Sequence, residues 1–221
     1  MPTFVPRLDI LPAPQRALWA ELDTTPEHFT LYGGTALALR LGHRQSVDFD
    51  FFSKVPFEPA ALAREIPYLA GAEPVQIVSH TLTCRVERSG PVLVSFFGNL
   101  NLGEVASPET AEGSAVHVAS LLDLAGTKAL TVQQRAQARD YIDIDALIRH
   151  GISLSMILAA GNVVYGRGFN PLITLKAMSY FEDVPALPIE VRERLRTAVA
   201  AVDLGRVPVL TPYVARREGR E

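Results

Sequence analysis

The sequence is poor in cysteine and has no long apolar run. Cys84 is the single cysteine among 221 residues, which excludes an internal disulfide framework and fits a reducing cytoplasm. We expect its thiol to be buried and inert, because neither a helix start nor a basic motif surrounds it. No apolar run approaches the roughly 20 residues of a membrane span. Prolines interrupt the stretch MPTFVPRLDILPAPQ where a signal peptide would need an apolar centre, so we expect a cytoplasmic protein with no membrane partner.

An excess of positive charge is also absent. The formal net charge is −3, so the molecule as a whole is not a general electrostatic binder of nucleic acid. A nucleic-acid substrate would have to meet a local basic patch. With 48% hydrophobic and 20% charged residues, the composition is that of an ordinary globular protein. The length fits one large domain or two small ones, and no internal repeat or low-complexity stretch is present.

The two halves of the sequence carry different patterns. In the first half we expect helices over residues 13–22, 36–42 and near 58–66, and strands over 29–32, 46–52 and within 74–98, with a turn at 89–91. In the second half we expect only helices, over residues 117–135, 139–151, 153–164, 171–181 and 189–203. The fold class is therefore predicted to be α/β (α+β), with a mixed sheet followed by a helical half.

The polar, turn-rich stretch SPETAEGS places a domain boundary near residues 107–116. We accordingly expect an α/β core over residues 1–110 and a helical region over 111–221 that contributes to the active-site cleft. One continuous domain with a helical flank is the alternative. The final stretch, VARREGRE, is expected to be a frayed tail.

Two aspartates stand out in the predicted strand SVDFDFF. Side chains of a strand alternate between its faces, so Asp48 and Asp50 project from one side and Phe49 and Phe51 from the other. Carboxylates this close repel one another and are costly to desolvate. The pair therefore indicates a site for Mg²⁺ or Mn²⁺, completed by substrate oxygens.

A glycine turn precedes the aspartates. Gly33 and Gly34 stand between a predicted strand and a predicted helix, where glycine allows positive φ and a close approach of the main chain to a ligand. The free N–H groups at a helix start form an anion site suited to phosphate. Thr35 could cap that helix or donate its hydroxyl to a phosphate oxygen. Alone this turn is a weak signal, but a phosphate cradle beside a carboxylate pair is more specific.

The stretch LYGGTALALRLGHRQSVDFDFF resembles the first motif of the AbiE-type nucleotidyltransferase toxins, a branch of the DNA polymerase β superfamily. The matching residues are Gly33, Gly34, Thr35, His43, Arg44, Ser46, Asp48 and Asp50. The resemblance implies a polymerase-β-like nucleotidyltransferase domain in which Asp48 and Asp50 bind the metal. It also implies that Arg44, with the Gly33–Thr35 turn, holds the triphosphate of an NTP. Ser46 could orient a ligand or itself take a nucleotide or phosphate.

A second stretch, LLDLAGTKALTVQQRAQARDYIDIDAL, resembles the later motifs of the same family. Its matching residues are Lys128, Arg135, Arg139, Asp140, Tyr141 and Asp143. Lys128 and Arg135 are two helical turns apart and share a face if the helix is unbroken. The resemblance places Lys128 and Asp140 in the active site, with Lys128 on the triphosphate. From the residues alone, Lys128 and Arg135 would by default belong to a solvated amphipathic face. Asp140 and Asp143 could simply form ion pairs with Arg139 and neighbouring arginines.

One position departs from the pattern of many polymerase β relatives, which carry a third carboxylate on a later strand. Ser95 stands at that place here. Two carboxylates could suffice, Glu87 or Asp140 could supply the third, or the enzyme could be impaired.

The resemblance implies a metal-dependent enzyme that transfers NMP from an NTP to an acceptor hydroxyl. The implied acceptor is RNA, at the 3′ end of a tRNA, and the implied partner is an antitoxin. A non-catalytic nucleotide-binding or interaction module is one alternative, and a small-molecule or protein acceptor is another.

Overall fold

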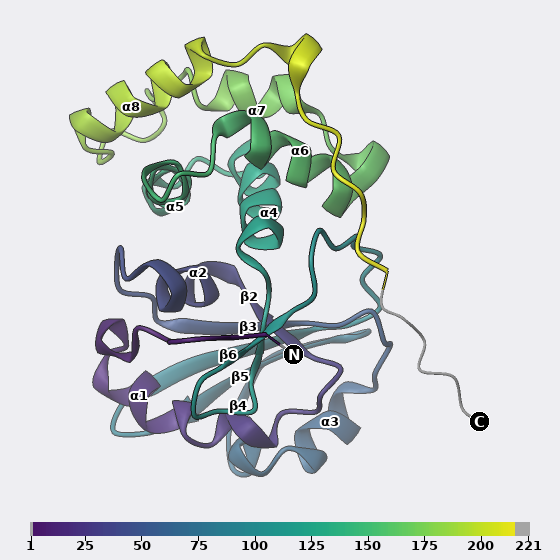
Figure 1. Ribbon diagram of the computed structural model, residues 1–221. Helices are drawn as coiled ribbons and strands as arrows, with labels where there is room; N and C mark the ends of the chain where they lie inside the picture. Colours follow the sequence, from purple (N-terminus) through teal and green to yellow (C-terminus); the bar gives the residue numbers. More distant parts are fainter. Residues whose placement is uncertain (1, 215–221) are drawn as a thin grey trace. The chain divides into compact units, whose positions relative to one another are not determined.

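The computed structural model describes residues 2–214, so the predicted frayed tail lies outside the described residues from position 215 on. The chain divides into two compact units. The first contains the residues up to Asn101 together with Pro108–Leu124, and the second contains Leu102–Ser107 together with the residues from Ala125 on. The domain boundary near residues 107–116 stays a prediction. Figure 1 shows the sheet of the first unit and the helices of the second.

The first unit is built on one mixed sheet. Its strands are β1 (Thr3–Phe4), β2 (Thr30–Tyr32), β3 (Asp48–Phe52), β4 (Glu73–Val78), β5 (Thr81–Glu87), β6 (Pro91–Phe97), β7 (Glu109–Ala111) and β8 (His117–Val118). Their order is β1-β7-β8-β2-β3-β6-β5-β4. Strand β3 lies near the centre, antiparallel to β2 and parallel to β6. This confirms the predicted α/β class with a mixed sheet.

The two faces of this sheet differ. Phe49 and Phe51 are fully buried on one face, where helices α1 (Ala13–Trp19) and α3 (Pro59–Glu65) pack (Figure 1). The Trp19 ring of α1 lies 6.2 Å from the Phe49 ring, centroid to centroid. Helix α2 (Gly33–Leu41) follows β2 and contacts β3. An apolar layer thus anchors one face of β3 and leaves its other face to carry polar side chains.

The elements of the first half follow the sequence prediction closely. The turn expected at 89–91 is present between β5 and β6, with Ser89 and Gly90 both at positive φ. The helix expected over 36–42 begins earlier, at Gly33, and ends at Leu41, where Gly42 with its φ of 62° forms a left-handed cap. The sequence prediction missed the short strands β1, β7 and β8, which have too few residues for a periodic pattern.

The second unit is helical. Helix α4 (Leu121–Gln134) begins in the first unit and continues into the second, followed by α5 (Ala138–Arg149), α6 (Leu154–Tyr165), α7 (Pro171–Ala177) and α8 (Ile189–Ala200). Short 3-10 helices cover Leu8–Ile10, Leu22–Thr24, Pro67–Leu69, Gly166–Gly168 and Leu204–Arg206 of the chain. The Ser153 hydroxyl caps α6 by accepting a hydrogen bond from the Met156 N–H at 3.2 Å. The predicted helical second half is confirmed from Leu121 on, whereas the first residues of the helix predicted over 117–135 form strand β8 instead.

Within residues 2–214, no single helix has both the length and the apolar character that crossing a membrane requires. One bent pair, Ala138–Arg149 with Leu154–Gly168, passes that test by length and composition only.

Candidate active site

Strand β3 sets the direction of the two predicted metal ligands. Asp48 and Asp50 lie on the face opposite the buried Phe49 and Phe51, and both are partly exposed. The apolar face fixes the register, because a slip by one residue would exchange aspartates and phenylalanines between the two faces. The carboxylates are therefore held together on an accessible face, as the alternation in the sequence predicts.

The glycine turn approaches the second aspartate closely. Gly33 opens α2 with a φ of 75°, a conformation that favours glycine. A Cβ atom at this position would collide with the Asp50 carboxylate. Both the backbone conformation and the space beside Asp50 therefore require glycine here.

The next two residues make further contacts with the same motif. A Cβ atom on Gly34 would collide with the Arg44 guanidinium and lie 3.1 Å from the Ser46 hydroxyl oxygen. The Thr35 hydroxyl donates a hydrogen bond to the main-chain oxygen of Asp48. Thr35 thus ties α2 to β3 through this hydrogen bond, and its predicted contact with a phosphate stays a prediction. The first unit brings together all the site residues that the first motif predicts.

The arrangement suits a phosphate next to a divalent cation. No side chain caps the first turn of α2, and the Arg44 guanidinium beside Gly34 adds positive charge at that end. Over the described residues 2–214, no group of three or more His, Cys, Asp or Glu side chains could hold a metal ion. Asp48 and Asp50 fit a cation such as Mg²⁺ only if water and substrate oxygens complete its coordination.

Ser95, which stands where many polymerase β relatives carry a third carboxylate, lies on β6. Ser95 on β6 pairs in register with Asp50 and is 8% exposed, and the Thr83 hydroxyl donates to its hydroxyl oxygen at 3.1 Å. Glu87 lies on β5, which β6 separates from β3, and pairs with Pro91 at the far end of β6. Glu87 is therefore not placed beside Asp50.

The second unit gathers the charged residues of the later motif. The Lys128 ammonium of α4 lies 2.9 Å from Asp140 and 2.7 Å from Asp143, both on α5. The Arg135 guanidinium also binds Asp140, through Nε at 2.8 Å and Nη2 at 3.2 Å. Lys128 is 6% exposed and both aspartates are 0% exposed. Two cations and two carboxylates thus form a network of balanced charge, which is buried except for Arg135, whose side chain is 44% exposed.

The network sets the ionisation of Asp140. Burial alone would raise the pKa of this carboxyl group, but the Arg135 hydrogen bonds and the Lys128 charge together hold the pKa below its usual value of 3.8. Asp140 therefore stays ionised at neutral pH despite its burial. Ion pairing of Asp140, one of the sequence alternatives, is present, with Lys128 and Arg135 as partners.

Two members of this network were outside the predicted site. Asp143 was left out, although its spacing of three residues from Asp140 places both on one face of a helix. Arg135 matches the family motif and the helix face predicted for Lys128, but the sequence assigned it no role in the site. The expectation that Lys128 and Arg135 share a face is confirmed, because both bind Asp140.

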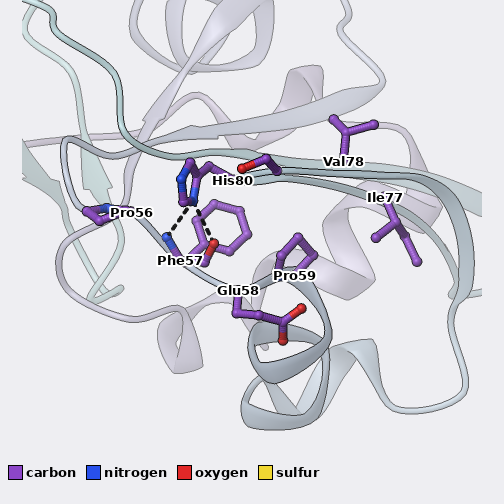
Figure 2. A pocket seen from close by; sticks show the side chains of 8 residues that line it. Pro56, Phe57, Glu58, Pro59, Ile77, Val78 and His80 are labelled. Atoms are coloured by element: carbon purple, nitrogen blue, oxygen red, sulfur yellow. Dashed lines mark hydrogen bonds between the residues drawn. The ribbon is translucent and has the colours of Figure 1, made fainter.

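A hollow of about 610 Å³ lies elsewhere on the first unit (Figure 2). It is lined by Pro56, Phe57, Glu58, Pro59, Ile77, Val78, Ser79 and His80. The His80 ring lies against the Phe57 main chain, with Nδ1 at 2.8 Å from the Phe57 oxygen. None of the predicted catalytic or nucleotide-binding residues lines this hollow. Cys84 is buried in the same unit, as expected, and burial raises the pKa of its thiol.

The sequence of this chain is similar to that of known proteins. The sequence profile of the family described as nucleotidyl transferase AbiEii toxin, type IV TA system, matches residues 16–208. An uncharacterised protein of Aquifex aeolicus (strain VF5) is 32% identical over 158 residues, which are 70% of this chain and 74% of that protein.

Solved structures show the same fold. MenT4, a nucleotidyltransferase toxin of Mycobacterium tuberculosis H37Rv, superposes with a TM-score of 0.63 at 20% identity, over 90% of this chain and 84% of that one. A proposed nucleotidyltransferase of H. pylori superposes with a TM-score of 0.51 at 17% identity, over 84% and 90% of the two chains. The predicted nucleotidyltransferase fold is confirmed.

Proposed function

This chain belongs to the AbiEii family of nucleotidyltransferase toxins of type IV toxin–antitoxin systems, and from that premise we propose that it transfers NMP from an NTP to an RNA hydroxyl. In this reaction the acceptor oxygen forms a bond to the α-phosphorus. The bond from that phosphorus to the bridging oxygen breaks, and pyrophosphate leaves with the electron pair. The proton of the acceptor hydroxyl passes to a basic group or to water.

The observation that carries this proposal is the contact between the glycine turn and the aspartate strand. Gly33 abuts Asp50, and the Thr35 hydroxyl binds the Asp48 main chain. A phosphate held by the N–H groups at the start of α2 would therefore lie beside the carboxylate pair. Arg44, next to Gly34, supplies a cation for the same phosphates.

Asp48 and Asp50 are the proposed ligands of Mg²⁺ or Mn²⁺, since both cations accept an all-oxygen ligand set. When bound, the metal polarises the phosphoryl group and neutralises the leaving pyrophosphate. Since two carboxylates leave most of the coordination shell to other oxygens, we expect the NTP phosphates to complete it. Ser95, in register with Asp50, adds no charge to this set.

Three further residues receive roles in the same reaction. We assign Lys128 to the triphosphate, where an ammonium neutralises negative charge, and Asp140 to the same catalytic group. Ser46, whose hydroxyl lies near Gly34, is assigned the orientation of the bound nucleotide. The family also implies a cognate antitoxin as partner, and we place the activity in the cytoplasm, where NTPs and RNA are present.

The acceptor proposed is the 3′ end of a tRNA. The test is incubation of the protein with each labelled NTP, Mg²⁺ and total cellular RNA, followed by separation of RNA, protein and small molecules. Label in the tRNA fraction that disappears in the Asp48→Asn variant supports the proposal. Label that appears instead in protein or in a small molecule contradicts the RNA acceptor and keeps the transferase activity. No Mg²⁺-dependent label in any fraction contradicts the proposed function.

A further inference from the structure

Asp143 has no role in the proposed reaction, although it lies closer to the Lys128 ammonium than Asp140 does. The Asp143 Oδ2 atom is 2.7 Å from Nζ, compared with 2.9 Å for the Asp140 Oδ1 atom. Its side chain is 0% exposed. A fully buried carboxylate is destabilising unless it is paired, so Asp143 and Lys128 depend on each other for their charged states.

The two aspartates hold the ammonium from one helix. Asp140 and Asp143 are three residues apart on α5 and therefore lie on the same face, toward Lys128 on α4. An ammonium group has three N–H donors, one of which goes to Asp140, while the Asp143 carboxylate pairs with the same nitrogen at 2.7 Å. Asp140 is shared, because it also accepts two hydrogen bonds from Arg135. Asp143 and Asp140 therefore share the neutralisation of the Lys128 charge, with Asp143 at the shorter distance.

We propose that Asp143 is a positioning residue, which with Asp140 fixes the Lys128 ammonium so that its third N–H is presented to a phosphate oxygen of the NTP. This inference rests on the proposed function, since it assumes that Lys128 acts on the triphosphate. A lysine has four flexible methylene groups, and a single contact leaves its ammonium free to swing. Two carboxylate contacts fix its position before substrate binds, which is the condition under which a charge stabilises a transition state most.

A merely structural ion pair is available on the same helix as a matched control. Asp145 is 2% exposed and accepts hydrogen bonds from Arg194 of α8 at 2.6 and 2.8 Å. It lies two residues from Asp143 on the same helix, and its carboxylate pairs with Arg194. Asp145→Asn therefore removes a buried charge from α5 without touching the ammonium.

The kinetic test compares Asp143→Asn, Asp143→Glu, Asp145→Asn, Lys128→Ala and the double variant Lys128→Ala/Asp143→Asn, each per mole of folded protein. We expect Asp143→Asn to lower kcat by about 10- to 100-fold, the cost of a misplaced catalytic group. Asp143→Glu should recover part of the loss, and Asp145→Asn should leave kcat unchanged. Because Asp143 acts through Lys128, the double variant should be no slower than Lys128→Ala.

The second readout does not depend on activity. The chain has only three lysines, and Lys54 and Lys176 are exposed. Brief acylation of the folded protein, followed by peptide mass spectrometry, gives the labelling of Lys128 relative to those two standards. We expect Lys128 to be protected in the wild type, several-fold more labelled in Asp143→Asn, and still protected in Asp145→Asn.

The outcomes separate the two hypotheses. If the wild type transfers nucleotide, two results overturn the positioning role and leave the proposed function standing. One is additive losses of kcat in the double variant, and the other is unchanged Lys128 labelling in Asp143→Asn. Absence of transfer by the wild type with every NTP and acceptor overturns the proposed function, and the positioning role with it.

Discussion

The carboxylates of the two units differ in exposure and in ion pairing. In the first, Asp48 and Asp50 lie on a partly exposed strand face, beside a glycine turn that leaves room for a ligand. In the second, Asp140 and Asp143 are fully buried and matched by Lys128. The same residue type is thus accessible to an external cation in one unit and neutralised by an internal one in the other.

The difference follows from the cost of desolvation. A buried carboxylate keeps its charge only if a cation and hydrogen bonds replace water, and once paired it holds its surroundings rigidly. A carboxylate at a partly exposed face keeps much of its hydration and can exchange water for a metal ion. We therefore expect changes in the first unit to affect mainly activity and changes in the second to affect stability as well.

The largest expected effect is the loss of the strand carboxylates. Asp48→Ala and Asp50→Ala should each lower nucleotidyl transfer by about 10³-fold, because the metal loses one of two protein ligands. The melting temperature should stay constant or rise slightly, since the repulsion between two close carboxylates is relieved. Steady-state transfer and thermal unfolding measure the two effects. Wild-type transfer rates in both variants would contradict the assignment of Asp48 and Asp50 as metal ligands. The control is Asp9→Ala, which removes a carboxylate from an exposed ion pair.

Lys128→Ala should behave differently, because it removes the buried cation that Asp140 and Asp143 share. The expected loss of stability is about 3–5 kcal/mol, together with the loss of transfer. Urea unfolding measures the first and single-turnover transfer under folded conditions the second. Stability within about 0.5 kcal/mol of the wild type would show that the network does not hold the second unit together.

Gly33→Ala tests the approach of the turn to Asp50. The substitution should cost roughly 1–2 kcal/mol for positive φ and should also displace the Asp50 carboxylate, weakening binding of the NTP–metal pair. Gly71→Ala is a matched control, because Gly71 has the same φ of 75° with no atom within 4 Å of an added Cβ. NTP affinity should fall only in the first variant. Equal affinities in the two would contradict the role of the turn.

Acid should act on the second unit through Asp140. The pKa of Asp140 is lower in the folded protein than its ordinary value of 3.8, so its ionised form stabilises the fold. That contribution is complete above the unfolded pKa and is lost as the pH falls through the folded pKa, hence below about pH 4. Urea midpoints between pH 7 and pH 2 should fall less steeply in Asp140→Asn than in the wild type. Parallel curves would contradict this linkage.

The smallest effect is expected at an exposed ion pair of the first unit. Arg85 and Glu73 are 2.6 Å apart, but their side chains are 44% and 65% exposed. Glu73→Ala should therefore change stability by about 0–1 kcal/mol, and less in high salt. A loss as large as that of Lys128→Ala would show that burial does not explain the difference between the units.

Much of the candidate site could be predicted from the sequence because its signals are local. The alternation in DFDFF placed both aspartates on one face, and the Gly-Gly-Thr turn between strand and helix indicated an anion site. The short strands β1, β7 and β8 escaped prediction, because their pairing partners, rather than their own residues, make them strands. The hydrogen bond from the Thr35 hydroxyl to the Asp48 main chain also escaped prediction, because it joins residues that are thirteen positions apart in the sequence.

The sequence by itself determined the periodicities, the conformations open to glycine and the kinds of charge available, since these depend on a residue and its near neighbours. Only the tertiary structure decided which cation meets which carboxylate. Lys128 lies twelve and fifteen residues before Asp140 and Asp143, and the packing of α4 against α5 brings its ammonium within 3 Å of both. Burial then makes that pairing necessary, because a buried charge that has lost its hydration is stabilised only by an opposite charge and hydrogen bonds.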